Sequence, residues 1–319
     1  MVSALWALLI AAVVAAALTW PVRALSLRIG AVAYPGGRHI HSEPTARAGG
    51  LAIYAGFWIA LLVVTWPLKA PFTGILIGSA LLLVMCLADS IKDLSPVLRL
   101  VGQFIVALIA FEGGVAIHGL TNPLGAHGLH NYISLGWWSA PLTILWIMAI
   151  TNAMNWLDGL DGLVAGVATL AGLTMMVGAG LTAGIPIAVT IAAGALAGGC
   201  LGFLPYNFNP AKLFMGDTGS MFLGYMLACL AVIGPFKIAT AVAVLVPLLM
   251  LGVPIFDTTS AIIRRLREGR SPLAADRGHI HHRLIDRGLS VRQAVLFIYL
   301  LTAILCLVAL YLWRWRYGG

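Results

Sequence analysis

Residues 2–20 read VSALWALLIAAVVAAALTW, a stretch without a charge, and this stretch decides the class of fold. A run of about 20 apolar residues is what an α-helix needs to cross the hydrocarbon core of a bilayer. The rest of the chain continues the pattern, because 61% of its 319 residues are hydrophobic and only 9% are charged. A water-soluble fold cannot hide that much apolar surface, so the sequence predicts a multi-pass helical membrane protein.

Ten membrane spans are expected, in an all-α transmembrane bundle that forms a single domain over residues 1–319. They lie near 2–20, 48–66, 71–88, 100–117, 137–153, 164–180, 185–204, 218–233, 238–256 and 292–313. Five connecting segments then share one face of the membrane: 21–47, 89–99, 152–163, 205–217 and 257–291. In the seventh span, Gly194, Gly198 and Gly202 recur at every fourth residue, a spacing that lets two helices approach closely.

The basic residues indicate the orientation of the bundle. With the N-terminus outside, 15 of the 19 Lys and Arg residues fall on the face of the five segments, and only Lys69, Lys237, Arg314 and Arg316 fall elsewhere. Cytoplasmic loops carry such an excess, so we expect the five segments to be cytoplasmic, at the inner (plasma) membrane. Topology then explains the net charge of +8, which gives no reason to expect nucleic acid as a partner.

Acidic residues gather on the same face, which the rule for Lys and Arg does not require. Every Asp and Glu except Glu112 lies in or beside the five segments. Carboxylates at a membrane boundary are costly near lipid and mark functional sites. We therefore expect the five cytoplasmic loops to form an active site.

The strongest motif, NAMNWLDGLDG, occupies residues 152–162. Asn152, Asn155, Asp158 and Asp161 recur at every third residue, so neighbours in the series share a helix face that rotates by about 60° per step. Capping a helix end needs one such side chain. Four of them indicate a functional site.

A second motif, NPAKLFMGDTGS, occupies residues 209–220 and enters the eighth span. Backbone donors at a helix start bind anions, and Asp217 can hold a hard cation against the same phosphates. Lys212 adds positive charge, and Arg47 in the first inner segment is a weaker candidate for substrate binding. A simple N-cap is the alternative role of Asp217.

Two further segments contribute from the same face. Asp89 ends the third apolar run, where an unpaired carboxylate tends to be protonated unless a cation or metal is near. His279, His281, His282 and Arg283 follow a run of arginines. A guanidinium group makes bidentate hydrogen bonds to phosphate oxygens, which suits binding of a sugar phosphate. A patch that binds anionic lipid also explains the arginines.

Together these motifs resemble the polyprenyl-phosphate N-acetylhexosamine-1-phosphate transferase family, within glycosyltransferase family 4. The family patterns Asn-Ala-x-Asn-x-x-Asp-Gly-x-Asp-Gly and Pro-Ala-Lys-x-Phe-Met-Gly-Asp-Thr-Gly-Ser fall on residues 152–162 and 210–220. The form His-Ile-His-His-Arg at 279–283 resembles the branch that uses UDP-N-acetylglucosamine. The branch that uses UDP-muramoyl-pentapeptide is a more distant resemblance.

The resemblance implies a reaction and the catalytic roles. A phosphate oxygen of a polyprenyl (undecaprenyl) phosphate attacks the β-phosphorus of a UDP-N-acetylhexosamine and releases UMP, initiating the synthesis of a cell-envelope polysaccharide such as O-antigen. Mg²⁺, or Mn²⁺ in its place, is expected on Asp217 and Asn155. Asp89 is expected to position or deprotonate the lipid phosphate, and Asp158 and Asp161 to face the uridine and ribose.

The same resemblance implies a set of residues that bind substrate. They are Asn152, Asn155, Lys212, His279, His281, His282, Arg283 and Arg47. The histidines and Arg283 would hold the sugar and the diphosphate, while the lipid tail lies in the bilayer. The sequence leaves open which hexosamine is used and whether the chain forms a homodimer.

One position departs from the family pattern. Two adjacent aspartates usually follow the third span, whereas this chain has Asp89 followed by Ser90. A non-catalytic relative that binds polyprenyl phosphate or the UDP-sugar is therefore the alternative function. An anion transporter is a more distant one, because transporters place their polar groups near the bilayer midplane rather than at one face.

Overall fold

Helices dominate the computed structural model, which describes residues 1–33, 45–92, 94–121, 132–182, 184–234, 248, 251–269 and 279–317. The first half of the chain forms α1 (Val2–Arg28), α2 (Gly50–Thr65), α3 (Phe72–Lys92), α4 (Pro96–Glu112), a short 3-10 helix (Gly136–Trp138) and α5 (Ser139–Leu157). The second half forms α6 (Leu163–Gly180), α7 (Ile187–Asn207), α8 (Gly216–Ile233), α10 (Gly252–Arg267), α11 (Ile280–Asp286) and α12 (Val291–Tyr317). The predicted all-α class is confirmed.

Within the described residues, seven helices are long and apolar enough to cross a bilayer, so the chain is a multi-pass membrane protein. They are α1, α3, α5 with the 3-10 turn before it, α6, α7, α8 and α12. Helix α2 is apolar but has only 16 residues. The ninth expected span, 238–256, lies largely outside the described residues, and the count of ten stays a prediction.

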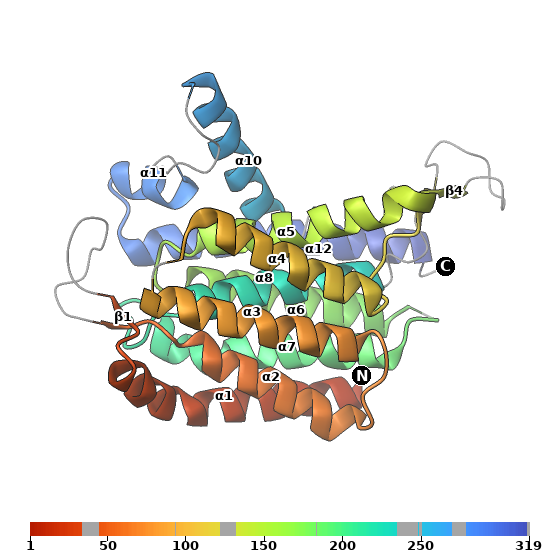
Figure 1. The fold of residues 1–319 in the computed structure, drawn as a ribbon, viewed down its shortest axis with the longest axis horizontal. Coiled ribbons are helices and arrows are strands. Elements are labelled where there is room, and N and C mark those ends of the chain that lie inside the picture. Colours follow the sequence, from red (N-terminus) through yellow and green to blue (C-terminus); the bar gives the residue numbers. More distant parts are fainter. Residues whose placement is uncertain are drawn as a thin grey trace.

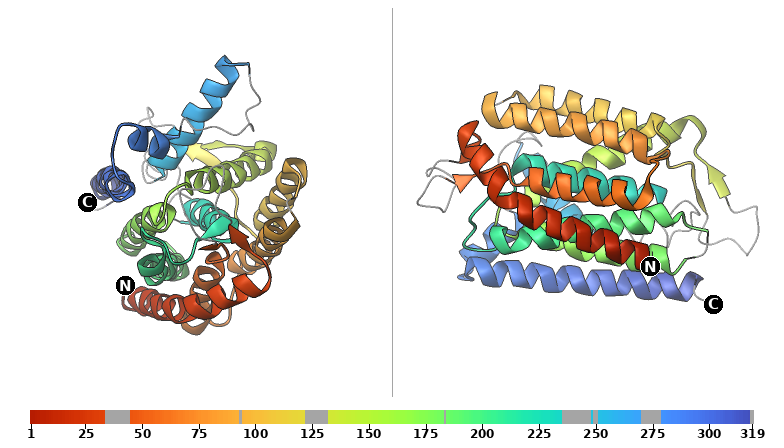
Figure 2. Two further views of the ribbon diagram at one scale, coloured as in Figure 1. Left: turned by 90° about the vertical axis from the view of Figure 1, so that its left-hand side faces the viewer. Right: turned by 90° about the horizontal axis from the view of Figure 1, so that it is seen from below.

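The helices lie side by side along the long axis of the molecule (Figure 1). Both chain termini are at one end of the bundle, and β1 (Val32–Ala33) and α11 are at the other. The end-on view in Figure 2 places α8 in the middle of the bundle, and 89% of its apolar window is buried. A residue at the start of α8 therefore lies at the centre of an end face.

Two short antiparallel strand pairs depart from a purely helical architecture. Strand β1 pairs with β2 (Thr45–Ala46), and β3 (Gly119–Thr121) pairs with β4 (Tyr132–Ser134). The backbone N–H of Phe214 donates to the carbonyl of Ala46 (2.9 Å). The first pair is thereby joined to the segment that leads into α8.

At the end that carries β1, helices run past the predicted ends of their spans. Helix α3 continues to Lys92 rather than 88, and α5 continues to Leu157 rather than 153. The prediction ended them too early because hydropathy measures only the apolar stretch, whereas a helix continues where its polar residues reach water. Asp89 and Asn155 therefore lie on helices rather than in loops, which fixes the faces from which they project.

Helices α1 and α7 pack backbone against backbone, as the glycine spacing predicted. A Cβ added at Gly198 would lie 2.1 Å from the carbonyl oxygen of Leu8, and one at Gly202 would lie 2.1 Å from that of Ala12. Gly194 faces α1 in the same way. In lipid, such close approach replaces the hydrophobic driving force that water would provide.

We predict that Gly198→Ala lowers the thermal stability of the protein, although Ala is the better helix former by about 1 kcal/mol. The added methyl collides with backbone, which a rotamer change cannot relieve, and overpacking of this kind costs about 1–3 kcal/mol. Gly178→Ala is the matched control, because its Cβ would meet only ordinary contacts at 3.7 Å and beyond. Melting in detergent should therefore rank Gly198→Ala below the unaltered protein and Gly178→Ala at or above it. Equal melting of the two variants would contradict the backbone contact.

Candidate active site

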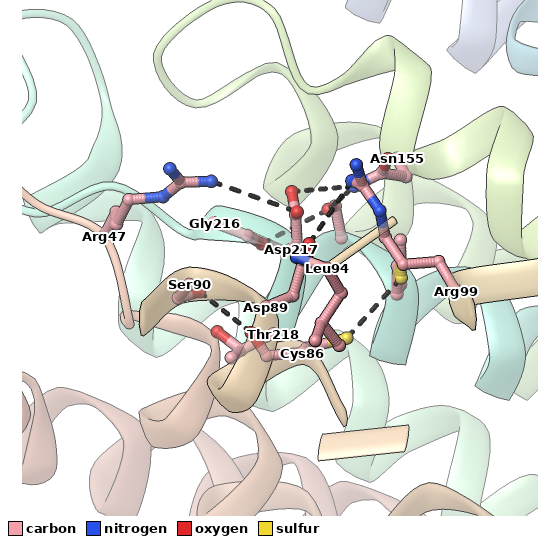
Figure 3. Close-up of polar contacts among 12 residues, drawn as sticks. Arg47, Cys86, Asp89, Ser90, Leu94, Arg99, Asn155, Gly216, Asp217 and Thr218 are labelled. Carbon is pink, nitrogen blue, oxygen red and sulfur yellow. Dashed lines mark hydrogen bonds and ion pairs between the residues drawn. The ribbon is translucent and has the colours of Figure 1, made fainter. Parts of the chain in front are cut away.

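Asp217 lies in the first turn of α8 and is held from two sides (Figure 3). Asn155, from the last turn of α5, donates through Nδ2 to Asp217 Oδ1 (3.0 Å) and to Ser220 Oγ (3.0 Å). Nη2 of Arg47 lies 3.9 Å from Asp217 Oδ2. Gly216 has φ 68°, and a Cβ there would lie 1.9 Å from the carbonyl oxygen of Arg47. Only glycine lets the segment carrying Arg47 come this close.

Asp89 is buried near the end of α3 and has a cationic partner. Its Oδ2 lies 3.3 Å from Nη1 of Arg99, and its Oδ1 accepts from the backbone N–H of Leu94 (2.8 Å). An ionised carboxylate at this position needs a cation nearby. Arg99, in the first turn of α4, is that cation. Figure 3 draws Asp89 and Asp217 in one close-up, and their helices meet there, because Cys86 Sγ on α3 lies 3.5 Å from Met221 Sδ on α8.

Ser90 stands where the family pattern usually has a second aspartate. Its hydroxyl donates to the carbonyl of Cys86 one turn earlier in α3 (2.9 Å). This is the usual way in which a serine side chain is satisfied inside a helix. The hydroxyl adds no negative charge to the site, so Asp89 is the carboxylate that α3 contributes.

Residues 158–162 form a tight turn between α5 and α6, and distant helices hold its end. Gly162 has φ 81°, a conformation that glycine adopts without strain. Its N–H donates to Asn207 Oδ1 (3.1 Å), and its carbonyl accepts from the hydroxyl of Tyr299 (2.5 Å). The turn is therefore fixed by α7 and α12 together.

Asp161 joins the first motif to the second. Its Oδ2 accepts from Nδ2 of Asn209 (3.0 Å) and from the backbone N–H of Ala211 (3.1 Å). The next residue, Lys212, has an exposed side chain, and its carbonyl accepts from Nε of Arg23 (3.3 Å). Asp161 thus orders the segment that presents Lys212.

Asp158 lies directly after α5, and its pKa is perturbed. Burial, reinforced by Asp217, raises its pKa from 3.8 to about 8, while Arg47 acts in the opposite direction. Neighbouring carboxylates of this kind do not both ionise unless a cation compensates them. Asp158, Asp217 and Arg47 therefore interact electrostatically where α5 ends and α8 begins.

The histidine motif approaches the same turn from α11. His281 is buried against Gly159, where an added Cβ would lie 2.1 Å from its Nε2. Burial, reinforced by His282, lowers the pKa of His281 from 6.5 to about 3, so this ring is neutral near pH 7. The ring of His279 is nearly parallel to that of His281, with the centroids 5.7 Å apart. Arg283 is exposed on the same helix, whereas residues 276–278 lie outside the described part of the chain.

Asn152 makes a different kind of contact from the other members of its motif. It exchanges two hydrogen bonds with Gln103 on α4, at 2.6 and 3.3 Å, and also donates to the carbonyl of Met148 (2.8 Å). Gln103 is buried. This reciprocal amide pair ties α4 to α5, which is a structural reason for an asparagine at this position.

Three residues that the sequence analysis did not select lie next to those that it did: Arg99, Gln103 and Asp257. Arg99 was counted only as a topological charge. Asp257 is the only charged residue between Lys237 and Arg264, and an isolated carboxylate in an apolar run is a signal that the sequence did contain. Gln103 had no comparable signal, because single buried amides are common in helix packing.

Comparison with known proteins places this geometry in a family. The sequence model described as glycosyl transferase family 4 matches residues 72–235, which include Asp89, Asp217 and the turn between α5 and α6. A probable undecaprenyl-phosphate N-acetylglucosaminyl 1-phosphate transferase of Bacillus subtilis is 40% identical over 291 residues, covering 91% of this chain and 80% of that protein. The chain belongs to glycosyl transferase family 4.

Two other relatives mark the breadth of the family. A decaprenyl-phosphate N-acetylglucosaminephosphotransferase of Mycolicibacterium smegmatis is 37% identical, covering 93% of this chain and 79% of that protein. A phospho-N-acetylmuramoyl-pentapeptide-transferase of Moorella thermoacetica is 35% identical, covering 98% of this chain and 99% of that protein. The family resemblance inferred from the four motifs is thereby confirmed.

We predict that Asn152→Ala and Gln103→Ala each lower the stability of the protein, and that the double variant loses less than the sum of the two. Asn152→Ala leaves the buried amide of Gln103 without its partner, at a cost of about 1–3 kcal/mol, and Gln103→Ala removes the same pair from the half-buried Asn152. Melting temperatures of the four proteins in detergent give the comparison. The opposite pattern, in which Asn152→Ala melts normally but no longer binds UDP-N-acetylglucosamine, would make Asn152 a substrate contact, as the sequence suggested.

Proposed function

We propose that this protein transfers N-acetylglucosamine 1-phosphate from UDP-N-acetylglucosamine to a polyprenyl phosphate, releasing UMP, at the cytoplasmic face of the plasma membrane. The observation that carries the proposal is the gathering of Asp89, Asp158 and Asp217 beside Arg47 and Arg99 at one end of a membrane bundle. The names of the relatives from Bacillus and Mycolicibacterium support the pair of substrates. The product would initiate a cell-envelope polysaccharide.

Both proposed substrates carry phosphate, so the chemistry is mainly positioning and charge neutralisation. Arg47 lies at the partly exposed edge of the site, 3.9 Å from Asp217, where a guanidinium can bind phosphate oxygens. Asp89, held by Arg99 and the Leu94 amide, is placed to orient the lipid phosphate or to accept its proton. The phosphate oxygen would then attack the β-phosphorus of the UDP-sugar.

The donor set fits Mg²⁺, with Mn²⁺ as a substitute. Asp217 and the amide oxygen of Asn155 are hard oxygen ligands, and Asp217 also contributes, after burial, to the raised pKa of Asp158. The described residues contain no group of three or more His, Cys, Asp or Glu that could hold a metal. A small number of protein ligands is enough for Mg²⁺, because phosphates and water occupy its other coordination positions. When bound, it would neutralise charge on the diphosphate.

The remaining site residues divide between binding and support. We propose that His279, His281, His282 and Arg283 contact the sugar and diphosphate, with Lys212 adding charge. The neutral state of His281 suits hydrogen bonding to a sugar hydroxyl rather than ion pairing. Asp158 and Asp161 remain candidates for the uridine and ribose, although the two hydrogen bonds of Asp161 to the 209–211 segment also support a structural role.

We predict that Asp217→Asn lowers the transfer of radiolabel from UDP-N-acetylglucosamine to undecaprenyl phosphate by about 100-fold or more, the effect expected for loss of one charge-stabilising group. Purified protein in detergent, with and without Mg²⁺, gives the measurement. Asp286→Asn is the matched control, because this carboxylate is exposed at the end of α11 and should be dispensable.

Each outcome of this experiment decides between functions. Mg²⁺-dependent labelled lipid from the unaltered protein, lost in Asp217→Asn and kept in Asp286→Asn, is the expected result. Absence of product from the unaltered protein with UDP-N-acetylglucosamine and with other UDP-sugars, while UDP-sugar still binds, would favour the non-catalytic alternative raised by Ser90. Full activity of both variants would show that transfer does not need the Asp217 carboxylate.

We predict that a cysteine at Ser290 is shielded from a membrane-impermeant thiol reagent in intact cells, whereas one at Lys69 reacts. Both positions are exposed. Lys69 lies in the connection between α2 and α3 and Ser290 in the connection between α11 and α12, and Figure 1 shows these two connections at opposite ends of the bundle. The four natural cysteines are buried and give little background. Permeabilised cells should label both positions. The reverse pattern in intact cells would place the site outside and overturn the proposed orientation.

A further inference from the structure

The histidine motif is tied to helix α10 by a carboxylate that no motif includes. Oδ2 of Asp257 lies 2.8 Å from Nδ1 of His279, and Oδ1 accepts from the backbone N–H of Ile280 (2.7 Å). Both side chains are buried, with Asp257 4% and His279 6% exposed. One carboxylate therefore fixes both the ring of His279 and the first residue of α11.

The other sides of the His279 ring are also occupied. His281 lies parallel to it, and Trp156 meets it edge to face with the centroids 6.5 Å apart. Since an ionised carboxylate can only accept, Nδ1 must carry the proton of the neutral ring. Nε2 is then the ring nitrogen that can accept a proton or, once protonated, donate to a ligand.

Helix α10 has one buried face, and Asp257 lies on it. Its described residues bury Val253, Asp257, Ala261 and Arg265, a spacing of four that forms one stripe. The guanidinium of Arg265 lies over the ring of Trp156, 5.0 Å from its centroid. The rest of the helix stands away from the bundle (Figure 1). Arg265 thus anchors α10 to the end of α5, and Asp257 joins it to the start of α11.

The contacts continue from Asp257 into the active site. His279 stacks on His281, and His281 is buried against Gly159 in the turn that carries Asp158 and Asp161. A change in the orientation of His279 would therefore shift His281 and, through it, the turn that carries Asp158 and Asp161.

We propose that Asp257 is a positioning residue for transfer: by accepting from Nδ1–H it holds the His279 ring in the orientation in which Nε2, once protonated, donates to the diphosphate of the UDP-sugar. This rests on the proposed function, since it assigns His279 to that substrate. Carboxylates that orient metal-bound histidines contribute about 10- to 100-fold to affinity or activity, and we expect an effect of the same size here.

The test compares kcat/KM for UDP-N-acetylglucosamine among the unaltered protein, Asp257→Asn, His279→Ala and the double variant. The amide of Asn can still accept from Ile280, but it offers Nδ1 a donor and no negative charge, so it no longer supports a ring that is protonated on both nitrogens. We expect Asp257→Asn to lower kcat/KM for the UDP-sugar by about 10- to 100-fold, with the KM for undecaprenyl phosphate unchanged. The double variant should be no worse than His279→Ala alone, because Asp257 acts through His279.

Controls separate positioning from folding. Asp286→Asn makes the same chemical change at an exposed residue of α11 and should keep full activity. Asp257→Glu retains an acceptor for Nδ1 and should recover part of the loss. If Asp257→Asn does not fold, Asp257→Glu takes its place in the cycle with His279→Ala. Melting in detergent identifies any variant whose loss merely follows its stability.

Three results would overturn the inference while leaving the proposed function intact: an Asp257→Asn variant within twofold of the unaltered protein, losses that multiply in the double variant, or equal changes in KM for both substrates. An unaltered protein that forms no labelled lipid would instead defeat the proposed function. The two failures are therefore distinguishable in one series of assays.

Discussion

A carboxylate at the end of an apolar bundle is stable as an ion only if a partner compensates it, and the active-site end is arranged around this constraint. Asp89 has Arg99 and the Leu94 amide, Asp217 has Asn155 and Arg47, and Asp257 has His279 and the Ile280 amide. Asp89 joins the consecutive helices α3 and α4, Asp257 joins α10 to α11, and Asp217 joins α8 to the distant helix α5. The charges that the chemistry needs are therefore also the contacts that close this end of the bundle.

Much of this arrangement could be predicted from the sequence because the signals are local. Apolar runs gave helix positions, and four motifs on one predicted face indicated that Asp89, Asn155 and Asp217 would meet. The ends of α3 and α5 could not be predicted, because hydropathy does not register a helix that continues into water. The small strands were missed because β1 and β2 have only two residues each.

The sequence did not predict which side chains from different helices pair with each other. Asn152 and Asn155 are the same residue type in one motif, yet Asn152 pairs with Gln103 in the packing of α4 and Asn155 with Asp217 in the site. Nothing local distinguishes the two. Likewise, the pairing of Asp257 with His279 depends on how α10 and α11 lie against α5, which only the folded chain defines.

The packing of α1 bears on how the chain is assembled during synthesis. The ribosome makes α1 well before α7, so α1 must enter the bilayer without the glycine groove that it will later fill. Its buried face consists mainly of alanine, at positions 4, 7, 11 and 15, and its exposed face carries Leu5, Trp6 and Leu9. Alanine methyl groups are tolerated by lipid as readily as by a neighbouring helix. Helix α1 can therefore stay in contact with lipid, at little cost in free energy, until α7 is inserted and packs against it.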